Sequence, residues 1–265
     1  LLSLSVGIMI GFLSAFIGLY LWLGDFILLA FSLLLFLFVL GIFFLMPLLA
    51  KIFNKFTPLP EGQLRTKLEE LLTKNGYKVN EIKVMDGSRR SSKANAYFSG
   101  LGKTKNIVLY DTILELMTEE EIVAVFAHEL GHGKNKDIFK GYLFSLLQIF
   151  IIIFISWLII SRVIFIQDFA FEKLNYGFAF ILILNVVIPF INMITLPIAN
   201  SFSRKREYKA DMFARKEGYQ EALISGLKKL SRNNYACLNP HPFTICMSYT
   251  HPPLSQRIAA LEKEM

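Results

Sequence analysis

Four long apolar stretches constrain this chain more than any other feature of its sequence. They cover residues 1–23, 26–49, 142–166 and 178–198. Each is long enough for an α-helix to cross a hydrocarbon core, which takes about 20 residues. The first has no basic leader and is followed almost at once by the second, which excludes a cleaved signal peptide and favours a tight hairpin. The sequence therefore predicts a multi-pass α-helical membrane protein.

The composition supports this prediction. Of 265 residues, 54% are hydrophobic and only 18% are charged, whereas globular domains carry about 25% charged residues. The 25 Phe exclude a disordered chain, and the two cysteines are too few for a disulfide-stapled scaffold. Because the chain begins at Leu1 and not at a methionine, we expect it to be a piece of a longer product with further spans upstream.

The apolar stretches divide the chain into four parts. These are two transmembrane helices (1–50), a polar segment (51–141), two more transmembrane helices (142–198) and a C-terminal polar segment (199–265). Four spans place both polar segments on one side, and 26 of the 28 Lys and Arg lie there. An excess of Lys and Arg marks the cytoplasmic face. Topology and anionic membrane lipid thus explain the net charge of +7 without a nucleic-acid partner.

The polar segments have a mixed α+β pattern. Four leucines recur at helical spacing after Pro60 and predict an amphipathic helix over residues 61–74. Three short strands separated by turn residues are predicted at 82–85, 94–99 and 107–110, which indicates a small sheet or ribbon.

One helix of the first polar segment carries a catalytic pattern. Thr118 and Glu121 form a capping box that opens a helix running through His132. That helix contains the pattern HExxH, in which His128 and His132 lie one turn apart and can reach a single zinc ion. Glu129 lies beside them and can act as general base toward the attacking water.

HExxH alone leaves a second interpretation open, in which these side chains make ordinary surface hydrogen bonds. A third ligand distinguishes the two, because catalytic sites of the His₂Glu type need a carboxylate from elsewhere. Glu207 and Asp211 lie one helical turn apart directly after the fourth span. They could form a solvated helix face, but the span count places Glu207 on the same side as the two histidines. Asp211 then suits a supporting position beside a ligand.

These residues resemble a known family, the integral-membrane zinc metalloproteases of the CAAX prenyl protease type. Five motifs in the family's order carry the resemblance: residues 90–98, 107–112, 128–132, 200–211 and 250–257. The sequence departs from the family at Gly133, where a tryptophan is common, and it lacks the family's first spans. The resemblance implies a multi-pass α-helical membrane protein with an α+β zincin-like metalloprotease domain.

The resemblance also implies roles for single residues. One zinc per chain would be bound by His128, His132 and Glu207, with Glu129 as the base and Asp211 as a supporting acid that can also donate a proton.

Three more residues are implied at the substrate. Asn95 lies on a strand whose edge can bind a substrate backbone by strand addition. His251 and Arg257 are candidates for stabilising the transition state or gripping the substrate. For Arg257, a structural salt bridge is an equal alternative.

The resulting hypothesis is a membrane zinc metalloendopeptidase whose active-site segments face the cytoplasm. Its implied substrate is a peptide or protein C-terminus, lipidated or not, that enters from the bilayer lipid, as in CAAX processing. A rival enzyme is a heat-shock-type membrane quality-control zinc protease. A rival of another class is a transporter or scaffold with structural histidines. Cys237, His241, Cys246 and His251 match no standard zinc spacing, so we expect no second metal.

Overall fold

A computed structural model describes residues 54–89, 96–99, 104–161 and 182–263, and the single positions 11, 14, 22, 37 and 41. The chain divides into two compact units. One contains residues 1–49 and 145–191, and the other contains residues 50–144 and 192–265. The two predicted N-terminal spans lie outside the described residues, apart from those single positions.

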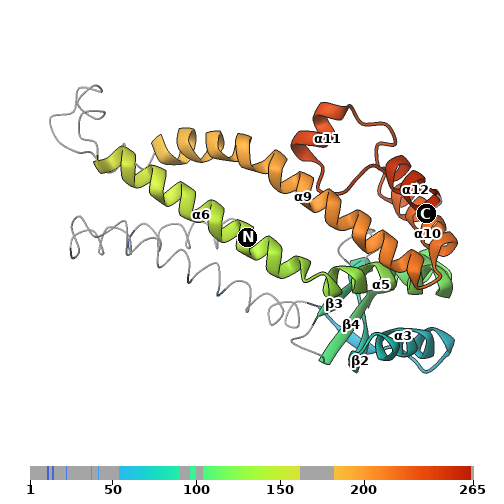
Figure 1. The fold of residues 1–265 in the computed structure, drawn as a ribbon. Coiled ribbons are helices and arrows are strands. Elements are labelled where there is room, and N and C mark those ends of the chain that lie inside the picture. The colour runs from blue at the N-terminus through green and yellow to red at the C-terminus, as the bar shows by residue number, and fades with distance from the viewer. Residues whose placement is uncertain are drawn as a thin grey trace. The chain divides into compact units, whose positions relative to one another are not determined.

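The described part is mostly helical (Figure 1). Its helices are α3 (Gln63–Lys74), α4 (Asp111–Leu116), α5 (Glu119–Lys134), α6 (Asp137–Ser161), α9 (Ile188–Lys216), α10 (Gln220–Asn233), α11 (Pro242–Ser248) and α12 (Leu254–Glu262), with a 3₁₀ turn η2 (Gly87–Arg89) and a π-helical turn η3 (Ile183–Val187). The amphipathic helix predicted at 61–74 is confirmed by α3, whose four leucines are buried.

A four-stranded sheet lies in the second unit. Its strands are β1 (Phe56–Pro58), β2 (Lys78–Met85), β3 (Ala96–Ser99) and β4 (Thr104–Tyr110), in the order β1-β2-β4-β3. The strands expected at 82–85 and 107–110 are confirmed, and both begin earlier than predicted. For the strand expected at 94–99, the structure describes residues 96–99 as β3. The sequence did not predict β1, because three residues ending in a proline are too short to show alternation.

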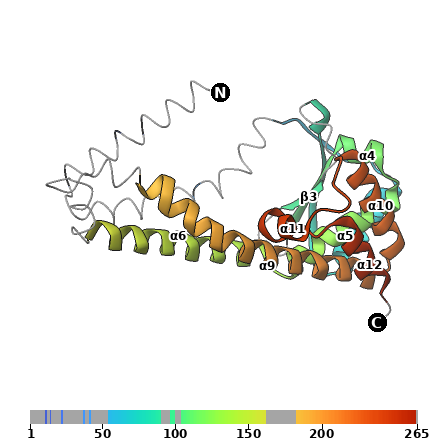
Figure 2. The ribbon, with the colours of Figure 1, turned by 90° about the horizontal axis from the view of Figure 1, so that it is seen from above.

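Helix α5 is the central element of the second unit. It packs against α3, α10 and β3, and its residues from Ile122 to Ala127 are buried in the core. The predicted capping box is confirmed: the Thr118 hydroxyl accepts from the Glu121 amide, and the Glu121 carboxylate accepts from the Thr118 amide. Figure 2 shows α10 and α12 gathered beside this helix. Packing in the core therefore positions the helix that carries HExxH.

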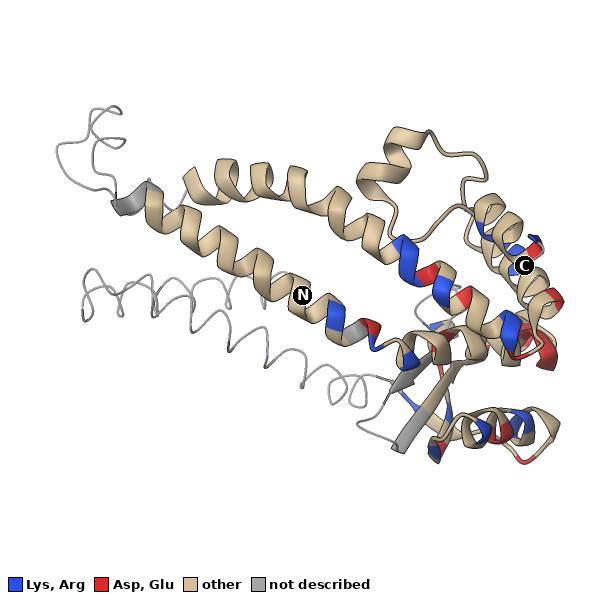
Figure 3. Cartoon of the chain, viewed as in Figure 1, with Lys and Arg blue, Asp and Glu red and all other residues tan. Residues whose placement is uncertain are grey.

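Among the residues that the structure describes, two helices are long and apolar enough to cross a membrane, judged by length and composition. These candidate spans are Phe139–Leu158, with a mean hydropathy of 2.1, and Ile183–Lys216, with a mean hydropathy of 1.7. They overlap the stretches predicted at 142–166 and 178–198. The charged residues of α6 lie at its start and those of α9 lie in its second half (Figure 3). The full four-span topology stays a prediction.

Candidate metal centre

The two histidines of HExxH face each other across one turn of α5. Their ring centroids are 4.8 Å apart, and the Nε2 atoms of His128 and His132 are 3.2 Å apart. His128 is buried and His132 is partly buried. Helix geometry alone brings these rings together, as the sequence spacing predicts.

Helix α9 brings Glu207 to the same point. Its Oε1 lies 3.2 Å from His132 Nε2, and its Oε2 lies 3.5 Å from His128 Nε2. Glu207 is only 4% exposed. One ligand atom from each of the three residues lies within 4.8 Å of the other two, so the structure brings together the three predicted ligands from segments far apart in sequence.

Gly131 makes this close approach of α5 and α9 possible. A Cβ at this position would lie 2.9 Å from the Ala210 Cα, which is too close for a real side chain, and 3.1 Å from the Phe213 Cβ, which is a tight contact. Backbone atoms cannot move aside as a flexible side chain can. The glycine inside HExxH therefore sets how near Glu207 can come to the histidines.

The remaining ring nitrogens show that the site fits a metal ion. His128 Nδ1 lies 2.8 Å from an Asp211 carboxylate oxygen, and His132 Nδ1 lies 2.9 Å from Asp137 Oδ2. A carboxylate partner holds the proton on Nδ1, which leaves the Nε2 lone pair free. Two such lone pairs and the Glu207 carboxylate then face one point, where a cation would satisfy all three. A donor set of two imidazoles and one carboxylate is typical of catalytic zinc.

The electrostatics of the site also favour positive charge at this point. Burial by itself lowers the pKa of His132, but hydrogen bonds with Glu207 and Asp137 outweigh it and raise the pKa to about 9. Glu129 lies on the same helix, and burial raises the pKa of its carboxyl above the ordinary value. A carboxyl group with a raised pKa is a better proton acceptor, as a general base requires.

Arg257, from α12, is bound to Asp211. Its Nε donates to Asp211 Oδ2 at 2.8 Å, and its Nη2 donates to the other carboxylate oxygen. Its Nη1 also lies 3.6 Å from Glu207 Oε2. This bidentate pair holds Asp211 where it faces His128, so the geometry favours the structural alternative for Arg257.

Of the other two predicted substrate residues, the structure describes His251. His251 lies between α11 and α12, and its Nδ1 is 2.9 Å from Glu207 Oε2. Its side chain is 65% exposed, so a substrate could reach it. Asn95 lies outside the described residues; β3, which starts at the next position, is an edge strand of the sheet.

Sequence reasoning missed the residues that place His251. Asn200 donates to the Met247 carbonyl at 2.8 Å, and Arg204 donates to the carbonyls of Ile245 and Tyr249 at 2.9 and 2.8 Å. These bonds fasten the last turn of α11 to α9, two residues before His251. The sequence signal for these bonds was the i,i+4 spacing of Asn200 and Arg204, which puts both on one helix face but does not indicate that this face binds α11.

Within the series of Cys237, His241, Cys246 and His251, the structure gives His241 a role in helix capping. His241 is the N-cap of α11, where its Nδ1 accepts from the Phe243 amide at 3.2 Å. Cys237 and Cys246 are free and exposed.

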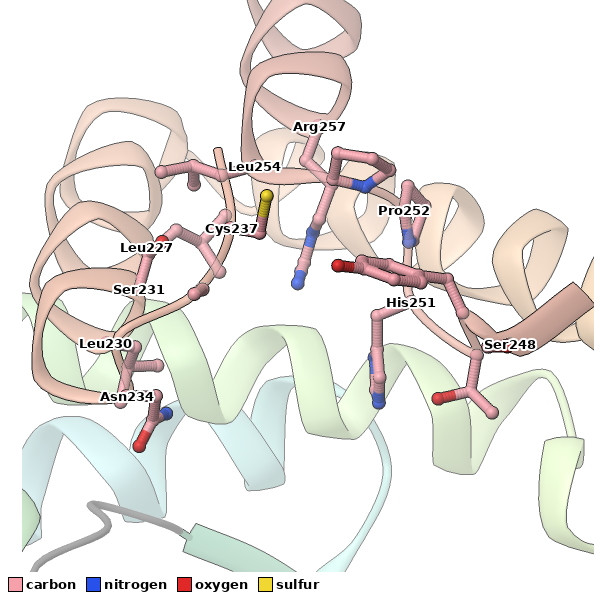
Figure 4. A pocket seen from close by; sticks show the side chains of 14 residues that line it. Leu227, Leu230, Ser231, Asn234, Cys237, Ser248, His251, Pro252, Leu254 and Arg257 are labelled. Carbon is pink, nitrogen blue, oxygen red and sulfur yellow. The ribbon is translucent and has the colours of Figure 1, made fainter. Parts of the chain in front are cut away.

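A cavity of about 520 Å³ adjoins the site. Figure 4 shows Leu227 and Leu230 of α10 on one side of it and His251 on the other, with Arg257 reaching between them. Cys237 and Pro252 also line it. Most of this lining is apolar, so the cavity is suited to an uncharged side chain beside the predicted ligands.

Comparison with known proteins agrees with this geometry. The model of peptidase family M48 matches residues 58–265. Three curated relatives are the CAAX prenyl protease 1 homologues of Oryza sativa (37% identity over 219 residues) and Arabidopsis thaliana (38% over 222) and the CAAX prenyl protease 1 of Saccharomyces cerevisiae (37% over 234). The matches cover 81%, 82% and 83% of this chain, and 50%, 51% and 51% of the relatives.

A solved structure is similar over almost the whole chain. The crystal structure of Ste24p from S. mikatae matches with a TM-score of 0.84 and 33% identity, covering 99% of this chain and 64% of the other. The present chain spans about half the length of the curated relatives it matches. With a family match over residues 58–265 and this fold, the chain belongs to peptidase family M48.

Proposed function

We propose that this chain is the metal-binding part of a membrane zinc metalloendopeptidase that hydrolyses peptide bonds. The observation that supports the proposal most is the convergence of His128, His132 and Glu207 on one point, beside a glutamate with a raised pKa. This arrangement supports a hydrolytic centre over a scaffold with structural histidines, because a scaffold needs no three ligand groups that converge on one point.

A bound zinc ion would act as a Lewis acid toward the scissile carbonyl and the attacking water. Glu129 takes a proton from that water as the water oxygen attacks the carbonyl carbon. When the C–N bond breaks, Glu129 returns this proton to the leaving amine. His251 lies where it can donate a hydrogen bond to the carbonyl oxygen as negative charge develops there. Asp211, held by Arg257, keeps the His128 ring in place.

The substrate binds as an extended peptide in this proposal. Its backbone adds to the edge of the sheet at β3, next to Asn95. One side chain then enters the apolar cavity beside His251. The names of the relatives support processing of the C-terminus of CAAX-type proteins, with or without a prenyl group on the substrate.

The topology of the enzyme is part of the proposal. Only two residues separate the end of α5 from the start of α6, and Glu207 follows the apolar half of α9. The ligands meet only if these ends of both apolar helices lie on one face of the membrane. The excess of Lys and Arg makes that face cytoplasmic. Cysteine labelling at Lys74 and Lys228 is expected to report one side and labelling at Glu172 the other; opposite sides for the two lysines would contradict the topology.

The test of function combines metal analysis with cleavage of a farnesylated and an unmodified peptide. The purified protein is expected to contain one zinc per chain and to lose cleavage when a chelator removes it. Glu129→Gln is expected to keep zinc and to lower kcat by roughly 10²- to 10⁴-fold, the range of general base catalysis. Glu119→Gln, an exposed acid on the same helix, is the matched control and should leave both unchanged. Full activity after zinc removal would contradict the proposal.

A further inference from the structure

Asp137 occupies a position that neither HExxH nor the proposed reaction accounts for. It is the first residue of α6, and it is only 7% exposed. Its Oδ2 lies 2.9 Å from Nδ1 of His132. A buried carboxylate needs a specific partner, and here that partner is the ring of a predicted metal ligand.

The chain adopts an uncommon conformation to deliver this carboxylate. Lys136, the preceding residue, has φ 53°, in the left-handed region that L residues other than glycine seldom occupy. Such a conformation costs on the order of 1 kcal/mol. This conformation makes the abrupt turn between α5 and α6, which returns Asp137 toward His132 on α5.

Helix α9 holds the same residue from the other side. Arg206 Nη1 donates to the Asp137 backbone carbonyl at 2.9 Å, and Arg206 directly precedes Glu207 in the chain. The start of α6 is therefore bound both to a ligand on α5 and to the residue next to the ligand on α9.

We propose that Asp137 is a positioning residue for the metal centre. Its carboxylate holds the proton of His132 on Nδ1 and fixes the ring plane, so that the Nε2 lone pair faces Glu207 and His128. The inference rests on the proposed function only in requiring that these three residues bind a metal ion. Asp211 has the equivalent position at His128, so each ligand histidine has its own buried carboxylate.

A purely structural role makes different predictions. An acidic residue in the first turn stabilises a helix N-terminus by about 0.3–1 kcal/mol. Asp137 Oδ1 also lies 3.8 Å from the Nζ atom of the exposed Lys140, which is too far for a hydrogen bond, so this contact contributes little. If these were the whole role, replacing Asp137 would lower stability slightly and leave metal binding unchanged.

The test measures the zinc dissociation constant of the full chain in detergent, by competition with a chromophoric chelator. Asp137→Ala is expected to weaken zinc binding by about 10- to 100-fold, the usual effect of losing such a partner. Asp137→Asn has the same shape, and it can turn its NH₂ group toward Nδ1. That places the proton on Nε2, where it blocks the metal, so a loss of about 10-fold or more is expected as well. If the alanine variant does not fold, the asparagine variant decides.

Lys140→Ala is the matched control, because it removes only the 3.8 Å contact between Asp137 and an exposed lysine, and its zinc affinity should equal that of the unaltered protein. A cobalt-substituted sample adds a spectroscopic measure: the visible absorption of the bound ion should change in Asp137→Asn and not in Lys140→Ala. Zinc affinities within twofold of the unaltered protein for both Asp137 variants would overturn this inference and leave the proposed function standing. If the unaltered protein binds no zinc through Glu207, the proposed function and this inference both fail.

Discussion

Helix α5 supports two buried polar clusters, one in each half, and they differ in how their hydrogen bonds are matched. In the first half, Glu121 accepts hydrogen bonds from the Thr118 amide at 2.8 Å, Ser225 Oγ at 2.7 Å and Lys229 Nζ at 2.6 Å. Each carboxylate oxygen has a donor. We call this set the Glu121 cluster.

In the second half, the ligand atoms of the metal centre are not matched in this way. The Nδ1 atoms of His128 and His132 face carboxylates, so their Nε2 atoms and the Glu207 carboxylate face one another, and Glu207 also lies 2.9 Å from His251 Nδ1. Both clusters are buried and charged, and burial alone would not separate them. Ligand atoms of three residues that converge on one point mark a ligand site, whereas a carboxylate whose two oxygens are both matched by donors marks a structural one.

The largest effect is expected from Glu207→Ala, which leaves zinc only two protein ligands. Both bound zinc and peptide cleavage should fall to background. Zinc content of the purified variant is the measurement. Glu217→Ala, an acid paired with Lys74 at the end of the same helix, should keep both. Near-stoichiometric zinc in Glu207→Ala would show that the metal centre is not the one described.

A smaller effect is expected from His251→Ala, because His251 serves the reaction and not the metal. Zinc content should stay the same, and kcat/KM should fall by roughly 10²-fold, the scale of losing one oxyanion donor. His241→Ala removes the other exposed histidine of this region and is the control. Unaltered kinetics in His251→Ala would assign it a structural role.

Gly131→Ala tests the approach of the two ligand helices. The added methyl group would press on the Ala210 backbone, and overpacking of this kind costs about 1–3 kcal/mol. Because the strain falls between α5 and α9, zinc should also bind more weakly. The variant Gly226→Ala is the comparison, since a Cβ there meets only side-chain atoms at 3.6 Å or beyond. Equal zinc affinity in both variants would contradict a spacing role for Gly131.

Glu121→Gln tests the structural side of the comparison. It removes the charge that Lys229 and Ser225 donate to, and the free energy of unfolding should fall by about 1–3 kcal/mol. Zinc content and the turnover of the folded enzyme should not change. Thermal unfolding in detergent measures the loss of stability, and Glu119→Gln, at an exposed position, is the control. A loss of zinc would mean that the two clusters are coupled.

The difference in stability between the unaltered protein and Glu121→Gln is expected to depend on pH. Burial by itself raises the pKa of Glu121, but hydrogen bonds from Lys229, Ser225 and Thr118 outweigh it, and the pKa is lowered. A lowered pKa means that the carboxylate stabilises the fold fully above its unfolded pKa of about 4.3, and that this contribution is lost as the pH falls through the folded pKa. The stability difference between the unaltered protein and Glu121→Gln should therefore be full at pH 7 and shrink below about pH 4. A constant difference would contradict this.

Much of the fold could be predicted because its signals are local. The periodicity of four leucines predicts α3, and the spacing of Thr118 and Glu121 predicts the start of α5. The two histidines meet because they are one turn apart on a single helix. Edge strand β1 could not be predicted, since a three-residue strand has no period to detect.

The sequence by itself determined which residues could bind a metal ion, because residue type and helical spacing are written in it. Only the tertiary structure decided that Glu207 reaches the histidines, that Gly131 permits the approach, and that Asp137 and Arg257 hold the supporting positions. Arg257 meets Asp211 across 46 positions, and Arg204 meets Ile245 across 41. Contacts at such separations depend on how helices pack, and packing follows from the summed fit of many side chains and not from any short pattern.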